Sequence, residues 1–190
     1  VISMSGTWMQ SVAQNWLVLS LTDSAVALGV TVGFQFGPVL LFGAWGGTLA
    51  DRVDKRRLLM GTQTAAAVLA LALGILSATD VVAVWMIWVL AGLTGTVTAL
   101  GMPSQQSFLY EMVGPDDLAN AVGLNSVVIN SSRIIGPAIG AVLIAGVGIA
   151  SCFFINAASF VAVILALAAM RTAELHRSAP VPREPGQVRA

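Results

Sequence analysis

The chain has 190 residues, of which 57% are hydrophobic and 9% are charged, and its formal net charge is zero. Soluble domains carry about 25% charged residues, so this composition is typical of a protein embedded in lipid. The zero net charge argues against a nucleic acid partner, because phosphate binding needs clustered positive charge. Cys152 and His176 are each the only residue of their type, so we expect no disulfide, no metal site and no cofactor.

Long uncharged stretches divide the chain into membrane spans. A transmembrane helix needs about 20 apolar residues, and each stretch is long enough for at least one. The spans are too long for the strands of a β-barrel, and their apolar and polar residues do not alternate. Because the chain begins at Val1 inside an apolar stretch, we expect its start to be truncated. We predict an all-α membrane protein with six transmembrane helices over residues 1–21, 24–49, 58–78, 82–102, 119–145 and 149–170.

The first predicted helix carries a polar stripe. Ser3, Gly6, Gln10 and Gln14 follow one another at intervals of three or four residues and so share a face. Such a face points into a bundle or a water-filled cavity rather than at lipid. Gln10 and Gln14 are therefore candidate substrate contacts, and the alternative is hydrogen bonding between helices.

Basic residues predict the orientation. One cluster lies between the second and third helices and another follows the sixth, whereas the opposite side carries only Asp23 and Asp80. This is the positive-inside pattern, and it predicts a cytoplasmic membrane protein with both ends in the cytoplasm. The two clusters consist of Arg52, Lys55, Arg56 and Arg57, and of Arg171, Arg177, Arg183 and Arg189.

Asp51 lies near the carboxyl end of the second predicted helix, where the helix dipole disfavours a negative charge. The charge therefore needs compensation. Arg52 and Lys55 are local candidates, and the amino terminus of another helix is a further one.

The fifth predicted helix carries Ser126, Asn130 and Arg133 on one face. Arg133 is the only charge near the middle of any span. A charge there costs from about 3 to more than 10 kcal/mol in lipid, so we expect the side chain to point inward. It would bind an anionic group of the substrate, pair with an acid of a missing second bundle, or hold carbonyls freed by Pro137. Asn130 and Arg133 are thus further candidate cavity residues.

A sequence similarity between two of the predicted helices suggests an internal repeat. Gly37-Pro38 in the second predicted helix corresponds to Gly136-Pro137 in the fifth, and further glycines follow each pair. The two helices are equivalent if the chain consists of two inverted three-helix units, as in many transporters. Residues 171–190 contain several prolines and arginines, and we predict a cytoplasmic tail or a linker to a second bundle.

The segment from Gly47 to Arg57 reads GTLADRVDKRR. It resembles the loop signature of the major facilitator superfamily, which has a glycine, then Asp-Arg, then a glycine and a basic run. Asp54 stands where the family usually has glycine, and aspartate tolerates left-handed turn geometry. Lys55 replaces the usual arginine and loses its planar fork. The resemblance implies a conformational switch at Gly47, Asp51, Arg52, Lys55 and Arg56, in which the aspartate holds two bundles together. The alternative is a solvated loop that only sets orientation.

Other segments extend the resemblance over nearly the whole chain, towards the enterobactin-exporter-like branch. Residues 136–141 resemble the helix-5 motif of antiporters and exporters, although Ala141 stands where many have glycine. In this motif Gly136, Pro137 and Gly140 would allow close packing and a bend. The remaining segments are WMQ at 8–10, VAQNWLV at 12–18, QFGP at 35–38, ANA at 119–121, LNS at 124–126, RIIGP at 133–137 and NA at 156–157.

The resemblance implies the amino-terminal half of a twelve-helix fold, whose first and fourth helices line a central cavity. The implied function is secondary export of small organic molecules, such as drugs or siderophores, by alternating access. Partners would be lipid, the substrate, and a second six-helix bundle or a second copy of the chain. A channel or a self-associating scaffold is the alternative. An intramembrane serine protease would need an embedded histidine, so we expect no enzyme.

Overall fold

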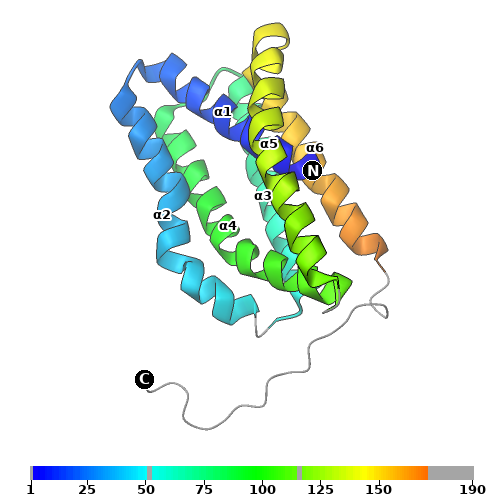
Figure 1. The fold of residues 1–190 in the computed structure, drawn as a ribbon. Coiled ribbons are helices and arrows are strands. Elements are labelled where there is room, and N and C mark those ends of the chain that lie inside the picture. Colours follow the sequence, from blue (N-terminus) through cyan, green and yellow to red (C-terminus); the bar gives the residue numbers. More distant parts are fainter. Residues whose placement is uncertain (1, 51–52, 115–116, 171–190) are drawn as a thin grey trace.

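Six helices make up the described part of the chain, which the computed structural model gives as residues 2–50, 53–114 and 117–170. The all-α membrane architecture is as predicted. The ends of α2, α4 and α6 and the starts of α3 and α5 lie at the lower end in Figure 1. The helices are α1 (Ile2–Thr22), α2 (Ala25–Ala50), α3 (Lys55–Ala78), α4 (Val84–Val113), α5 (Leu118–Gly146) and α6 (Ile149–Ala169).

Five helices, α2 to α6, are long and apolar enough to cross a membrane. The exception is α1, whose sequence contains two glutamines, an asparagine and several hydroxyl side chains. It packs against α5 and α6 and also touches α2 and α4. Protein therefore surrounds Gln10 and Gln14, which are buried, as a membrane requires of such groups.

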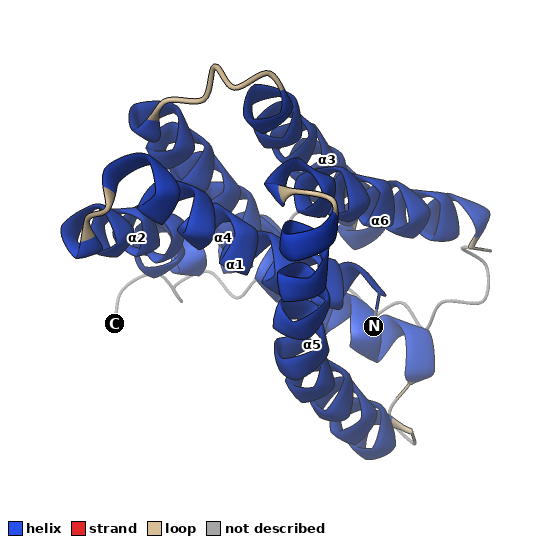
Figure 2. Ribbon diagram, turned by 90° about the horizontal axis from the view of Figure 1, so that it is seen from above, coloured by secondary structure: helices blue, strands red, loops and turns tan. Residues whose placement is uncertain are grey.

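The packing has the symmetry of an inverted repeat. The main helix pairs are α1 with α5, α4 with α2, and α3 with α6. Exchanging the units α1–α3 and α4–α6 turns the first pair into the second and leaves the third unchanged. Figure 2 shows two of these pairs from above, with α2 beside α4 and α3 beside α6. The predicted division into two three-helix units therefore agrees with the contacts.

Two predicted boundaries are wrong. We expected the fourth helix to end at residue 102, before Pro103, but α4 continues to Val113. The additional turns are held because Phe108 packs with Leu59 of α3 and Leu167 of α6. The third helix begins at Lys55 rather than at residue 58, so the basic run forms its first turn.

Glycines permit the closest helix contacts. On α5, a Cβ at Gly136 would lie 2.5 Å from the Ser5 carbonyl oxygen and 2.8 Å from the Trp8 Cβ. At the equivalent pair of helices, a Cβ at Gly95 of α4 would collide with the Gln35 carbonyl of α2. Small residues let membrane helices approach closely, and dispersion then holds them together. A Cβ at Gly37, by contrast, would have open space, so the Gly37-Pro38 and Gly136-Pro137 pairs are similar in sequence but not in packing.

We predict that Gly136→Ala destabilises the protein by about 1–3 kcal/mol, because its methyl group would push α5 away from α1. Gly123→Ala is the matched control on the same helix, since a Cβ there meets nothing within 4 Å. The control should be neutral or slightly stabilising, because alanine favours helix over glycine. Thermal unfolding in detergent measures both, and equal effects would contradict the packing role.

Candidate functional site

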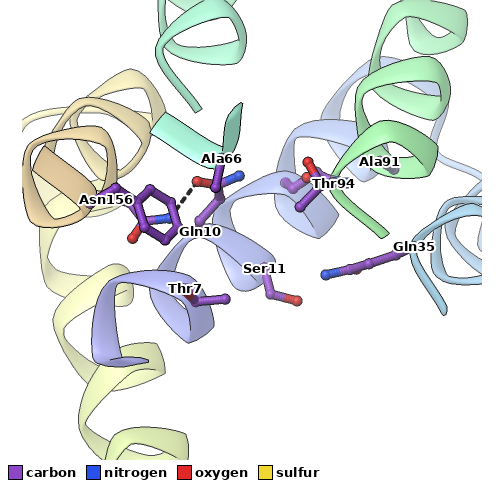
Figure 3. A pocket seen from close by; sticks show the side chains of 10 residues that line it. Thr7, Gln10, Ser11, Gln35, Ala66, Ala91, Thr94 and Asn156 are labelled. Carbon is purple, nitrogen blue, oxygen red and sulfur yellow. Dashed lines mark hydrogen bonds between the residues drawn. The ribbon is translucent and has the colours of Figure 1, made fainter. Parts of the chain in front are cut away.

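A polar pocket lies where α1 passes the other helices (Figure 3). Its cavity volume is about 20 Å³, which is close to the space that one water molecule occupies. None of the lining side chains is formally charged. The lining residues are Thr7, Gln10, Ser11 and Gln14 of α1, Gln35 of α2, Ala66 of α3, Ala91 and Thr94 of α4, and Asn156 and Phe160 of α6.

Asn156 joins α6 to α1 in this pocket. Its Nδ2 donates a hydrogen bond of 2.6 Å to Gln10 Oε1, which is drawn in Figure 3. Its Oδ1 accepts a hydrogen bond of 3.1 Å from Ser159 Oγ. Across the helix contact, Gly6 leaves room for this amide, because a Cβ there would collide with Asn156 Oδ1. The packing and both hydrogen bonds therefore hold Gln10 and Asn156 together.

Gln14 is different, because its amide nitrogen is not used by the bundle. The side chain is only 4% exposed. Within the described residues, its Nε2 has no hydrogen-bond partner. An unsatisfied buried donor costs about 1–3 kcal/mol.

The four predicted cavity residues lie in two different places in the structure. Gln10 and Gln14 line the pocket, whereas Asn130 and Arg133 are exposed on α5. Asn130 Nδ2 donates to the Ser126 carbonyl of its own helix at 2.9 Å. The Arg133 guanidinium lies over the Trp8 ring, 5.3 Å from the centroid, and the expected inward direction, towards a substrate or a second bundle, stays a prediction.

The rotation of α5 explains this difference. Ser132, Gly136 and Gly140 are buried and repeat every four residues, so they form the face that meets α1. Arg133 is one residue further along, and therefore about 100° around the helix. The predicted packing residues Gly136 and Gly140 thus lie against α1, while Pro137 beside them is half-buried.

Sequence reasoning missed Asn156, Gln35 and Thr94 as pocket residues. The signal for Asn156 was available, since it is the only amide in the otherwise apolar α6. Gln35 carried the same signal, as the only amide of α2. Thr94 had none, because polar side chains are common in α4.

The basic turn at the start of α3 contacts two other helices. Lys55 Nζ forms an ion pair of 2.7 Å with Glu111 Oε1 of α4. We considered Lys55 as compensation for Asp51, and the structure gives it this other partner. The left-handed geometry proposed for Asp54 is also wrong, because its φ is −56° and its side chain caps α3 by accepting from the Arg57 amide at 2.9 Å.

Arg56 caps the carboxyl end of α6. Its Nε donates to the Leu167 carbonyl at 2.7 Å and its Nη2 to the Ala168 carbonyl at 2.8 Å. The final carbonyls of a helix lack intrahelical partners, and a cation there also favours the helix dipole.

The remaining residues of the predicted switch give less structural information. Gly47 lies in α2 with open space at its Cβ position. Asp51 and Arg52 lie outside the described residues. The locking role of Asp51 stays a prediction.

Asp51→Asn should increase cysteine labelling at the proposed cytoplasmic ends of the helices, and unchanged labelling would leave only the orientation role.

Comparison with known proteins identifies the family. The family model described as transmembrane secretion effector, a major facilitator model, matches residues 1–190. The chain belongs to the major facilitator superfamily. This confirms the resemblance seen in the loop. No solved structure matches the chain significantly.

Three relatives within the superfamily show what the chain is similar to. It is 32% identical over 164 residues to the staphyloferrin A transporter of Staphylococcus aureus, covering 85% of the chain and 41% of that protein. It is 31% identical over 160 residues to YfiS, an uncharacterized MFS-type transporter of Bacillus subtilis, covering 84% and 37%. It is 29% identical over 172 residues to the multidrug efflux pump Tap of Mycolicibacterium fortuitum, covering 88% and 42%. The chain therefore spans about two fifths of the length of these relatives.

We predict that Arg56→Gln lowers the free energy of unfolding by about 1 kcal/mol or more, because charge-assisted hydrogen bonds to α6 are lost. Hydrogen exchange in the last turn of α6 should also become faster. Arg57→Gln is the matched control, since that side chain is exposed and only its backbone amide bonds to Asp54. Loss of stability in both variants to the same extent would show that general charge, and not the cap, matters.

Proposed function

We propose that this chain is the amino-terminal half of a secondary transporter that exports small organic molecules by alternating access. The carrying observation is the group of uncharged polar side chains that lines a small pocket beside α1 in an otherwise apolar bundle. Polar groups inside a membrane protein mark substrate paths more often than lipid contacts. Relatives named as a staphyloferrin A transporter and as multidrug efflux pumps support a small organic substrate.

The pocket is too small to enclose a drug-sized molecule by itself. Ligand sites of that kind have volumes of about 300–1,000 Å³, whereas this cavity has about 20 Å³. In transporters built from repeats, the substrate site lies at the interface of two bundles near the membrane midplane. The second surface would come from another six-helix bundle, and a second copy of this chain is the alternative source.

The proposed orientation places both ends of the chain in the cytoplasm. Lys55, Arg56 and Arg57 lie at the end where α2 meets α3, whereas Asp23 and Asp80 lie in the connections after α1 and α3. Basic residues near membrane helices favour the cytoplasmic side. Residues 171–190 would then be a cytoplasmic linker. The channel or scaffold alternative has no supporting observation, because the superfamily consists of transporters.

Arg133 is proposed to act outside the small pocket. Its exposed guanidinium, stacked on Trp8, is positioned to meet an acidic group of the second bundle or an anionic substrate. The aromatic face stabilises the positive charge of the guanidinium, and the N–H groups of the guanidinium stay free to donate hydrogen bonds. The alternative in which Arg133 holds carbonyls freed by Pro137 loses support, because the described residues show no hydrogen bond from Arg133 to a carbonyl.

The test is accumulation of a panel of drugs and siderophores in cells that lack their own major efflux pumps. The full-length protein should lower the accumulation of at least one compound, while residues 1–190 alone should not. Arg133→Gln should abolish this export at normal expression and stability, and Arg133→Lys should retain part of it because it keeps the charge. Unchanged accumulation of every compound would contradict the export function. Normal export by Arg133→Gln would contradict only the role of the arginine.

A further inference from the structure

Two exposed tryptophans lie on the side of the α2–α4 pair that is turned away from the polar pocket. Ala91 lines the pocket from α4, and Trp85 of the same helix lies about 120° around the helix from it. On α2, Trp45 follows Phe34 by about three turns and so shares its face, whereas Gln35 lines the pocket. Trp85 is 60% exposed and Trp45 is 72% exposed.

Trp88 shows how the bundle satisfies an indole that it partly encloses. Its Nε1 donates a hydrogen bond of 3.1 Å to Thr31 Oγ1 of α2. Its ring stacks on Phe34, with 6.2 Å between the ring centroids. A tryptophan inside a protein usually has such a partner for its N–H group. Trp88 therefore belongs to the contact between α2 and α4 and needs no acceptor from lipid.

The indole N–H groups of Trp85 and Trp45 have no comparable partner. Within residues 2–50, 53–114 and 117–170, Trp88 is the only tryptophan whose indole donates a hydrogen bond. The hydrocarbon interior offers no acceptor, so an N–H group exposed there would stay unsatisfied. Headgroups and their water offer acceptors, and tryptophans gather at this level on both sides of a membrane. We therefore expect both exposed indoles at the headgroup level.

The position of the pocket indicates what covers these side chains. In transporters built from repeats, the substrate site lies at the interface of two bundles. A second bundle would therefore face the pocket and leave the other side of the α2–α4 pair to lipid. This step uses the proposed two-bundle arrangement, but it does not depend on which compound is transported.

The spacing of the two tryptophans fits the thickness of a bilayer. The hydrogen bond between Trp88 and Thr31 places these residues at the same level of α2 and α4, which run in the same direction (Figure 1). At a rise of about 1.5 Å per residue, Trp85 lies about 4.5 Å to one side of this level and Trp45 about 21 Å to the other. The separation of about 25 Å is slightly less than the hydrocarbon thickness of about 30 Å, which suits indoles at its two boundaries.

The charged residues agree with these two levels. Asp80 lies in the connection just before α4, close in sequence to Trp85. Lys55 and Arg56 lie in the first turn of α3, beyond the end of α2 that carries Trp45. Charged side chains are costly in hydrocarbon, so each group marks a level outside it. Each tryptophan thus lies between a charged connection and the uncharged middle of its helix.

We propose that the outer surface of the α2–α4 pair, formed by Trp85, Trp88, Phe34 and Trp45, contacts phospholipid. Trp85 and Trp45 lie in the headgroup layers of opposite leaflets, and together they fix the depth of the bundle in the membrane. Their N–H groups donate to headgroup oxygens or to the water between them, while their rings remain against the upper part of the lipid chains.

Tryptophan fluorescence tests this placement in the full-length protein, reconstituted into phosphatidylcholine vesicles. The lipid chains carry bromine, which quenches indole emission on contact, either near the headgroup or near the bilayer centre. The emission of one tryptophan is the difference between the wild type and its Trp→Phe variant. Trp45→Tyr and Trp85→Tyr supply the same differences where a phenylalanine variant does not fold. Both tryptophans should lose more emission to bromine near the headgroup than to bromine near the centre.

Leu93→Trp is the matched depth control. Leu93 is 48% exposed on α4 and lies between the levels of Trp85 and Trp45, about 12 Å from Trp85 along the helix. An indole there should lose more emission to bromine near the centre, which would place the two native tryptophans in opposite leaflets.

Three results would overturn the proposal. Weak quenching of Trp45 or Trp85 by both lipids would mean that protein covers that side chain. Stronger quenching of either one by the central bromine would place it in the hydrocarbon. Preferential quenching of Leu93→Trp near the headgroup would contradict the two levels. Export is not measured, so each of these results bears on the lipid surface and leaves the proposed export function untouched.

Discussion

The polar side chains of α1 have to be enclosed by protein, because the membrane interior offers them no hydrogen-bond partner. Much of the bundle follows from this requirement. α5 meets α1 with Ser132, Gly136 and Gly140, which are small enough to let the two backbones approach. α6 contributes Asn156, whose amide satisfies Gln10, and Gly6 leaves the space for it. The amide nitrogen of Gln14 has no hydrogen-bond partner among the described residues.

The charged end of the bundle has a separate role. Lys55 joins α3 to α4 through Glu111, and Arg56 joins α3 to the end of α6. Basic residues in the first turn of a helix are unfavourable for its dipole, so these partners in other helices offset the cost. The loop signature of the superfamily therefore has a structural function within this half, in addition to any contact that it makes with a second bundle. The polar pocket lies elsewhere, and the two regions can be tested independently.

The number of helices and the polar stripe of α1 could be predicted from the sequence, because hydropathy and spacing determine them directly. The end of α4 could not, since a proline such as Pro103 favours a break, and contacts of Phe108 and Glu111 with other helices carry the helix onward. The sequence also could not predict that Arg133 is exposed in this bundle. A polar stripe gives the relative positions of residues on a helix, but the neighbouring helices decide which side of it is buried. The bond between Gln10 and Asn156 joins residues 146 positions apart, which no local pattern reveals.

The central claim is that one side of α1 lines a water-accessible substrate cavity while the adjacent side is sealed by packing. Single cysteines along α1 test it in the full-length protein, with Cys152 replaced by alanine to remove the native thiol. Thr7→Cys and Ser11→Cys, which line the pocket, should react with a water-soluble thiol reagent and be protected by a transported compound. Met9→Cys and Ala13→Cys, at positions no more than 2% exposed, should not react. Equal labelling on both sides, or labelling only at positions 9 and 13, would contradict the account.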